Sequence, residues 1–83
     1  MQENTRVAVI SIIAESTENI ELLNKTLHEY SDYIIGRMGI PYKQKGINII
    51  SIAVDAPQDI ISALAGKIGR IDKITTKTTF SNH

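Results

Sequence analysis

Two segments of the chain are apolar at almost every position. They are residues 6–14, RVAVISIIA, and residues 47–54, INIISIAV. Both are rich in β-branched side chains, and apolar residues occupy both alternating sets of positions, which is typical of strands that are covered on both faces. We therefore predict that these two segments are the central strands of a sheet.

Two further segments carry apolar side chains at helical spacing. The positions are Ile20, Leu23, Leu27 and Tyr30 in the first segment, and Ile60, Ile61, Leu64 and Ile68 in the second. This spacing predicts two amphipathic helices. Ser16 or Thr17 is expected to cap the first helix. Asp55 or Ala56 is expected to cap the second, with Pro57 in its first turn.

Two other segments have the features of edge strands. Residues 32–42, DYIIGRMGIPY, contain two glycines and a proline, which indicate a bulge or a close backbone approach within a strand at the edge of a sheet. Residues 71–79 end in the Thr/Lys pattern ITTKTT, which also suits an edge. The turn YKQKG at residues 42–46 links the first edge strand to a central strand, and Gly46 can supply a positive φ there.

The order of these elements is β-α-β-β-α-β, which is the ferredoxin-like arrangement. Right-handed crossovers give the strand order 4-1-3-2, so that the two most apolar segments fall in the middle of an antiparallel sheet. We therefore predict an α+β fold with two helices on one face of the sheet, formed by residues 1–83 as a single domain.

The predicted fold leaves one face of the sheet without helices. The first central strand would present Val7, Val9 and Ile13 on one face and Ala8, Ile10 and Ile12 on the other. A bare apolar face would be an unusually large exposed patch for a monomer. We therefore expect a homo-oligomer, a dimer or a larger even assembly such as a tetramer, built through the sheet or its edges.

Composition and charge exclude several classes of function. The chain has no cysteine and only two histidines, His28 and His83, so we expect no disulfide, no metal site and no cofactor. No nucleophile and base stand at a recognisable spacing, so we expect no enzyme. The net charge of zero argues against strong nucleic-acid binding. No apolar run approaches the length that spans a bilayer and the start is polar, so we expect a cytoplasmic protein that does not contact membranes.

The stretch SALAGKIGRI contains Gly66 and Gly69 beside Lys67 and Arg70. Its simplest interpretation is a helix end, in which Gly69 is left-handed, the two cations complement the helix dipole and Gly66 lets a neighbouring backbone approach. Nucleotide-binding fingerprints need glycines after a strand and before a helix, which is the reverse of the order here. The string GKIG also fits the GXXG loop of KH domains, so a KH-like RNA-binding module stays as an alternative.

The predicted topology brings three connections to one end of the sheet. They carry the four basic residues Lys43, Lys45, Lys67 and Arg70. Together with the positive N-terminus of the first helix, these side chains form a candidate site for a small anionic effector. Glu15 and Glu18 lie at the same end and could instead pair with the cations.

Arg37 lies in the glycine-flanked string GRMG of the first edge strand. It is either an outward charge that prevents aggregation at the edge or an oriented recognition group. An oligomer interface would favour the second interpretation.

The strings YIIGRMGIPY, INIISIAVDAP and above all ISALAGKIGRIDKITTKTT resemble the family of iron-only hydrogenase system regulators, short proteins with an ACT-like, ferredoxin-like fold. The resemblance covers almost the whole chain. Its most specific parts are Arg37, Gly39 and Pro41 and the helix end Ala63–Gly69. It implies a regulatory role, and it marks Arg37, Gly39 and Pro41 as candidates for an oligomer interface or for recognition.

The family is similar to the regulatory domain of the nickel-responsive repressor, which tetramerises and binds nickel through histidines and a cysteine. This chain has no cysteine, so nickel binding does not carry over. ACT domains that bind amino acids often have an acidic residue and a glycine after the first strand, whereas AESTENI here has no glycine. The chain has no helix-turn-helix, so a regulator of this kind would need a partner or would act on another protein.

Three functions therefore stay open. The first is a small oligomeric, ACT-like module that regulates the iron-only hydrogenase system or senses a ligand, as the resemblance implies. The second is KH-like RNA binding through the Gly66–Gly69 loop. The third is an assembly scaffold without a ligand.

Overall fold

The computed structural model describes residues 4–82, so His83 and the first three residues of the predicted domain lie outside the described part of the chain. The strands are β1 (Thr5–Ala14), β2 (Ile34–Tyr42), β3 (Ile47–Pro57) and β4 (Ile74–Phe80), and the helices are α1 (Ile20–Glu29) and α2 (Gln58–Gly69). Two short 3₁₀ turns, η1 (Ser31–Tyr33) and η2 (Lys43–Lys45), lie before and after β2.

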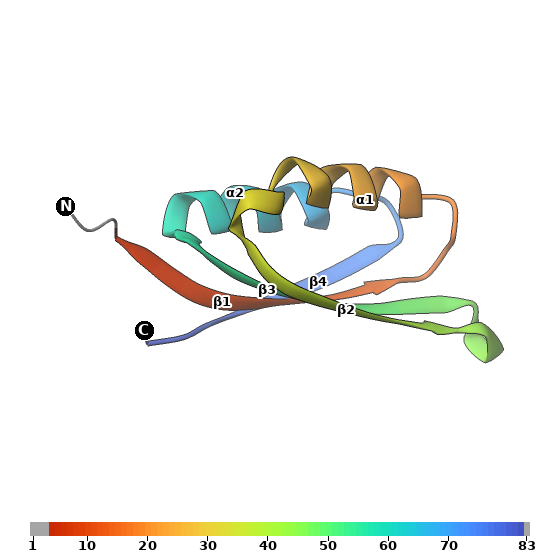
Figure 1. Ribbon diagram of the computed structural model, residues 1–83. Helices are drawn as coiled ribbons and strands as arrows, with labels where there is room; N and C mark the ends of the chain where they lie inside the picture. Colours follow the sequence, from red (N-terminus) through yellow and green to blue (C-terminus); the bar gives the residue numbers. More distant parts are fainter. Residues whose placement is uncertain (1–3, 83) are drawn as a thin grey trace.

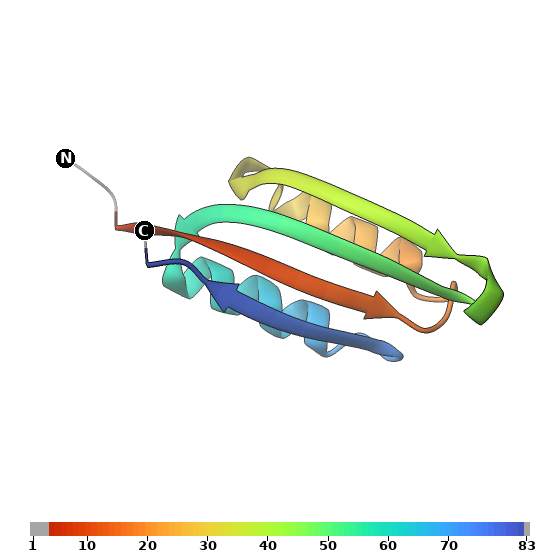
Figure 2. The same ribbon diagram turned by 90° about the horizontal axis from the view of Figure 1, so that it is seen from below.

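The four strands form one antiparallel sheet in the order β2-β3-β1-β4, which is the predicted order read from the other edge. The two most apolar segments are its central strands, as predicted. Both helices lie on one face of this sheet (Figure 1), and the view in Figure 2 shows the opposite face with the helices behind it. The fold is therefore α+β and ferredoxin-like.

The predicted helix starts are wrong by a few residues. α1 begins at Ile20, and Ser16 accepts a hydrogen bond from the Glu18 amide (3.1 Å) in a turn that precedes the helix. This approach segment is held to the connection between α2 and β4, because the Glu15 amide donates to the Lys73 carbonyl (2.8 Å) and the Asn19 side chain donates to the Asp72 carbonyl (2.7 Å).

The start of α2 differs from the predicted start for another reason. The pairing of β1 with β3 continues as far as Thr5 opposite Pro57, which keeps Asp55 and Ala56 in extended strand conformation. Pro57 therefore precedes the helix rather than lying in its first turn.

Glycine does not end α2 in the predicted way. Arg70 follows Gly69 with right-handed dihedral angles (φ −87°, ψ −7°), and the Ile71 amide donates to the Ile68 carbonyl (3.1 Å). The left-handed residue of this connection is Lys73, at φ 64°. A Cβ on Gly69 would lie 3.5 Å from the Thr76 Cγ2 atom, so this glycine lies close to β4 instead of reversing the chain.

Two other predictions for glycine and strand structure are confirmed. Gly46 has a positive φ of 65° after η2, where the β2–β3 hairpin turns. The register of β2 against β3 shifts between Ile34 and Gly36, which is the bulge that the glycines of this strand indicated.

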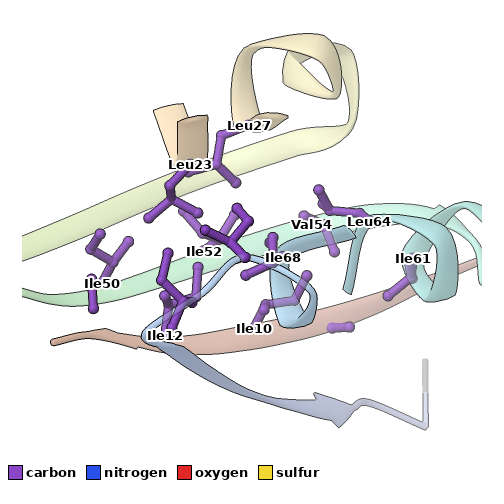
Figure 3. Packing of buried hydrophobic residues seen from close by; sticks show 14 of the residues in the cluster. Ile10, Ile12, Leu23, Leu27, Ile50, Ile52, Val54, Ile61, Leu64 and Ile68 are labelled. Atoms are coloured by element: carbon purple, nitrogen blue, oxygen red, sulfur yellow. The ribbon is translucent and has the colours of Figure 1, made fainter. Parts of the chain in front are cut away.

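The hydrophobic core lies between the sheet and the two helices. Alternate residues of β1 and β3 point towards the helices, where they meet the apolar sides of α1 and α2 (Figure 3). The largest fully buried side chains are Ile10, Ile12, Leu23, Leu27, Ile52, Val54, Ile61, Leu64 and Ile68. Each such side chain contributes about 1.5–3 kcal/mol to folding through its burial.

Arg6 joins three parts of the chain at one end of the sheet. Its guanidinium donates to the Gln58 side chain (3.0 Å) at the start of α2 and to the Ser81 carbonyl (2.9 Å) after β4. It also lies over the Phe80 ring, 4.7 Å from the centroid. Arg6 thus holds β1, α2 and the C-terminal end of β4 together.

Changing glycine to alanine at two positions should have effects of opposite sign. Gly46→Ala should lower the free energy of unfolding by about 1 kcal/mol, because φ at this position is left-handed. Gly66→Ala should raise it by about 1 kcal/mol, because the residue lies inside α2 and a Cβ meets only the end of the Arg70 side chain, at 3.8 Å. Urea denaturation measures both, and losses of equal size would contradict this account of the two glycines.

The contacts of Arg6 predict a graded loss of stability. Arg6→Ala removes two hydrogen bonds and the ring contact, and should cost about 2 kcal/mol. The matched variant Gln58→Ala removes only one of these bonds and should cost less than about 1 kcal/mol. Thermal or urea denaturation measures both losses. Equal losses for the two variants would show that the contacts of Arg6 with Ser81 and Phe80 do not stabilise the fold.

Candidate functional site

The sheet face away from the helices, here called the open face, carries large apolar side chains. Because successive residues of a strand point to opposite faces, the residues that alternate with the core residues of β1 and β3 point outward here. The exposed apolar side chains of this face are Val9, Ile13, Met38, Ile40, Tyr42 and Ile49, with exposed fractions from 38 to 61%. The prediction of an uncovered apolar face is therefore confirmed.

The open face has small polar residues at its centre and apolar residues beside them. Ser11 of β1 lies directly opposite Ser51 of β3. In the neighbouring row, Ile13, Ile49 and Ile40 lie side by side across β1, β3 and β2. The open face extends over all four strands of the sheet (Figure 2), and Lys77 of the edge strand β4 lies directly opposite Ser11.

A second surface feature is a depression of about 370 Å³ between α1 and α2, here called the interhelix groove. Four residues of α1 line one side of it at the spacing of a single helix face, and three residues at the end of α2 line the other. They are Leu22, Lys25, Thr26 and Glu29, and Lys67, Arg70 and Ile71. The Thr26 hydroxyl donates to the Leu22 carbonyl (2.9 Å), so this hydroxyl hydrogen is already bonded within α1.

Two of the groove's cations have defined positions. The Lys67 ammonium lies 5.1 Å from the centroid of the Tyr30 ring, a cation–π arrangement. A guanidinium nitrogen of Arg70 lies 3.8 Å from the point where a Cβ on Gly66 would be. A Cβ at this position would make only an ordinary van der Waals contact with Arg70, and no backbone of another described element lies within 4 Å of it, which corrects the expectation that a neighbouring backbone approaches Gly66.

The structure separates the four basic residues that the sequence predicted as one site. Lys67 and Arg70 line the interhelix groove, whereas Lys43 and Lys45 lie in η2 at the tip of the β2–β3 hairpin and do not line it. Figure 1 shows this tip beyond the ends of the helices. The third basic residue that lines the groove is Lys25 of α1.

Lys25 was missed because it looks like an ordinary residue on the polar side of α1. The predicted topology could have indicated Lys25, because its crossovers make the two helices antiparallel. The middle of α1 then lies beside the last turn of α2. The groove is consistent with this, because it is lined by Lys25 on one helix and Lys67 on the other.

Arg37 lies at a smaller depression of about 310 Å³ between α1 and β2. Its guanidinium donates to the Asn24 side chain (2.9 Å), so α1 orients it and it does not simply point away from the edge. His28 lines the same depression. Gly39 and Pro41 pair with β3 further along the strand, on the same face of β2 as Arg37, and both are exposed.

The Gly66-Lys67-Ile68-Gly69 segment is helical and not a loop. It forms the last turn of α2, and Ile68 is fully buried in the core. A GXXG clamp needs an exposed loop that leads into a helix, whereas this turn leads to β4. The structure therefore does not support the KH-like alternative.

Residues 4–82 contain no group of three histidine, cysteine, aspartate or glutamate side chains that could hold a metal ion. Neither of the two α-helices in this range has the length and hydropathy that crossing a bilayer requires.

Comparisons with known proteins place the chain in a family. The TM1266-like family model, described as "Iron-only hydrogenase system regulator, putative", matches residues 6–78. The solved structure of the uncharacterized protein TM1266 from Thermotoga maritima is similar, with a TM-score of 0.90 and 31% sequence identity over 93% of this chain and 98% of that chain. No curated protein matches the chain significantly.

A second solved structure shows how widely the fold is used. A formyltetrahydrofolate deformylase from Pseudomonas putida KT2440 matches 93% of this chain and 29% of its own, with a TM-score of 0.66 and 16% identity. At this level of identity the likeness concerns the fold alone. The family model and the similarity to TM1266 go further, and they show that this chain belongs to the TM1266-like family of iron-only hydrogenase system regulators.

Proposed function

We propose that this chain is a self-associating regulatory module of the iron-only hydrogenase system, in which the open face of one copy packs against the open face of a second copy and a small ligand tunes the assembly. The observation that carries the proposal is the uncovered apolar face opposite the helices. The family supports the regulatory role.

The size of the open face supports a homodimer. With strands about 4.8 Å apart and a rise of about 3.3 Å per residue, four strands of these lengths present on the order of 590 Å² in flat projection. Two stacked faces would then bury on the order of 1,200 Å², which is the lower end of the range of about 1,200–2,000 Å² for stable interfaces. The area of the open face is therefore compatible with a homodimer.

The chemistry of the open face also favours a second copy as its occupant. An isologous interface requires a patch that complements itself. The row of isoleucines across β1, β3 and β2 carries no charge, so two copies can pack these side chains together without burying one. Lys77 lies directly beside Ser11 on the edge strand β4, and Asp55 lies towards the end of β3, so the charges of this face are of opposite sign and lie outside the isoleucine row.

The regulatory action itself would pass through another protein. Both α-helices of the described residues pack on the sheet, and their apolar sides are used in the core. Neither is therefore available as a free recognition helix for DNA. A regulator built in this way would bind a protein of the hydrogenase system, and the ligand-free scaffold is the competing function.

Substitution on the open face should break the assembly. The wild-type chain should sediment as a dimer or a larger even oligomer at about 10 μM, which corresponds to an association free energy of at least about 7 kcal/mol. Ile13→Lys and Ile49→Lys should each yield folded monomers, because they place a charge inside the interface. Analytical ultracentrifugation measures the mass, and circular dichroism checks the fold.

Ser62→Lys is the matched control, because Ser62 is exposed on α2, on the helix side, and lines neither of the two depressions. This variant should keep the wild-type mass. A wild-type chain that is monomeric at about 100 μM, or loss of the oligomer in Ser62→Lys alone, would overturn the proposed interface.

A thermal shift screen separates the sensing module from the scaffold. A ligand that binds the folded state must raise the melting temperature. Melting temperatures that no small anion moves would favour the scaffold.

A further inference from the structure

We infer that the interhelix groove is a binding site for a small organic dianion that carries a short apolar group. This inference deepens the proposed function, on which it rests for its regulatory meaning, because it gives the ligand a place and a chemical class. The open face and the groove lie on opposite sides of the molecule, so a copy docked on the open face leaves the groove accessible.

The charge of the groove sets the charge of its ligand. Lys25, Lys67 and Arg70 face a single carboxylate, that of Glu29, which leaves an excess of two positive charges. Within the described part of the chain none of the three cations is neutralised by an ion pair. A ligand with two negative charges would balance this excess.

The positions of the cations favour a ligand that bridges the two helices. Lys25 comes from α1, whereas Lys67 and Arg70 come from the last turn of α2 and its cap. The carbonyl groups at the end of α2 carry partial negative charge, so an anion here is held by side chains and not by the backbone. The planar Arg70 guanidinium can donate two parallel hydrogen bonds to a carboxylate or phosphate group.

One of the cations has a partner that limits its movement. The Tyr30 ring holds the Lys67 ammonium at 5.1 Å from its centroid. Because this contact restricts a flexible side chain before any ligand arrives, binding costs less conformational entropy.

The apolar part of the ligand follows from the apolar residues that line the groove. Leu22 is 49% exposed there, and the Ile71 side chain is buried. The volume of about 370 Å³ lies at the lower end of the range for small-molecule sites. A compact ligand with a ring or a short alkyl group would cover Leu22, which a bare inorganic anion would leave exposed.

The test is a titration of the ¹⁵N-labelled full chain, followed by the amide resonances. Two probes differ in the source of their charge, phenyl phosphate as a phosphate monoester and phthalate as a dicarboxylate. Benzyl alcohol and inorganic phosphate control for the apolar and the anionic part alone. We expect saturable shifts at Lys25, Glu29 and residues 67–71 for one or both dianionic probes, with dissociation constants of about 0.1–1 mM, and at least about tenfold weaker binding of the two controls.

Charge-neutral variants locate the site. Lys25→Gln and Arg70→Gln should each weaken binding of phenyl phosphate or phthalate about fivefold, and the double variant should weaken it more. The matched control is the double variant Lys43→Gln/Lys45→Gln, which removes the same number of charges at the hairpin tip and should leave the dissociation constant unchanged. Leu22→Ser should weaken the ring-bearing probes but not inorganic phosphate.

Three outcomes would overturn the inference. They are the absence of saturable shifts up to about 10 mM probe, a larger loss in the hairpin variant than in the groove variants, and equal binding of benzyl alcohol. The sedimentation mass of the same samples is measured in parallel. A dimer that binds no dianion rejects the groove and keeps the proposed assembly, whereas a monomer that binds a dianion keeps the groove and rejects the assembly.

Discussion

The pairing of β1 with β3 is the constraint on which the rest of the structure depends. The two strands stay in register from Thr5 opposite Pro57 to Ala14 opposite Asn48. Both are apolar on each alternating set of positions, so the pairing sends one set under the helices and the other to the open face. Two helices can cover only one of these faces. The same pair of strands therefore builds both the core and the open face through which we propose that the chain self-associates.

The topology could be predicted because two independent signals agree, the order of the elements and the apolar character of β1 and β3. The ends of the helices could not, since they depend on contacts between distant segments. The bonds that Asp72 and Lys73 accept from the approach to α1 fix where that helix begins, and they lie far from it in the sequence. Of the four basic residues that the sequence grouped, Lys67 and Arg70 line the interhelix groove, and Lys25 adjoins them only because the two helices pack side by side.

The two functional surfaces proposed for this chain place different demands on the same fold. The open face is wide, shallow and apolar, which suits a partner with the same surface. The interhelix groove is small and rich in cations, which suits a small molecule. The core connects the open face to the helices, and hydrogen bonds connect the start of α1 to the segment between α2 and β4. A ligand that bridges the two helices would therefore contact elements that pack directly on the central strands.

The serines at the centre of the open face have a consequence for how the chain finds its native register. A strand that slips by one residue exchanges its two faces, and strands that are apolar on both faces resist this error weakly. In β1 and β3 a slip would bury Ser11 and Ser51 beneath the helices without hydrogen-bond partners from the sheet. It would also move Arg6 away from Gln58 and Ser81. These few polar groups thus distinguish the correct register from registers shifted by one residue. They allow a sheet that is apolar on both faces to fold with one defined face towards the helices.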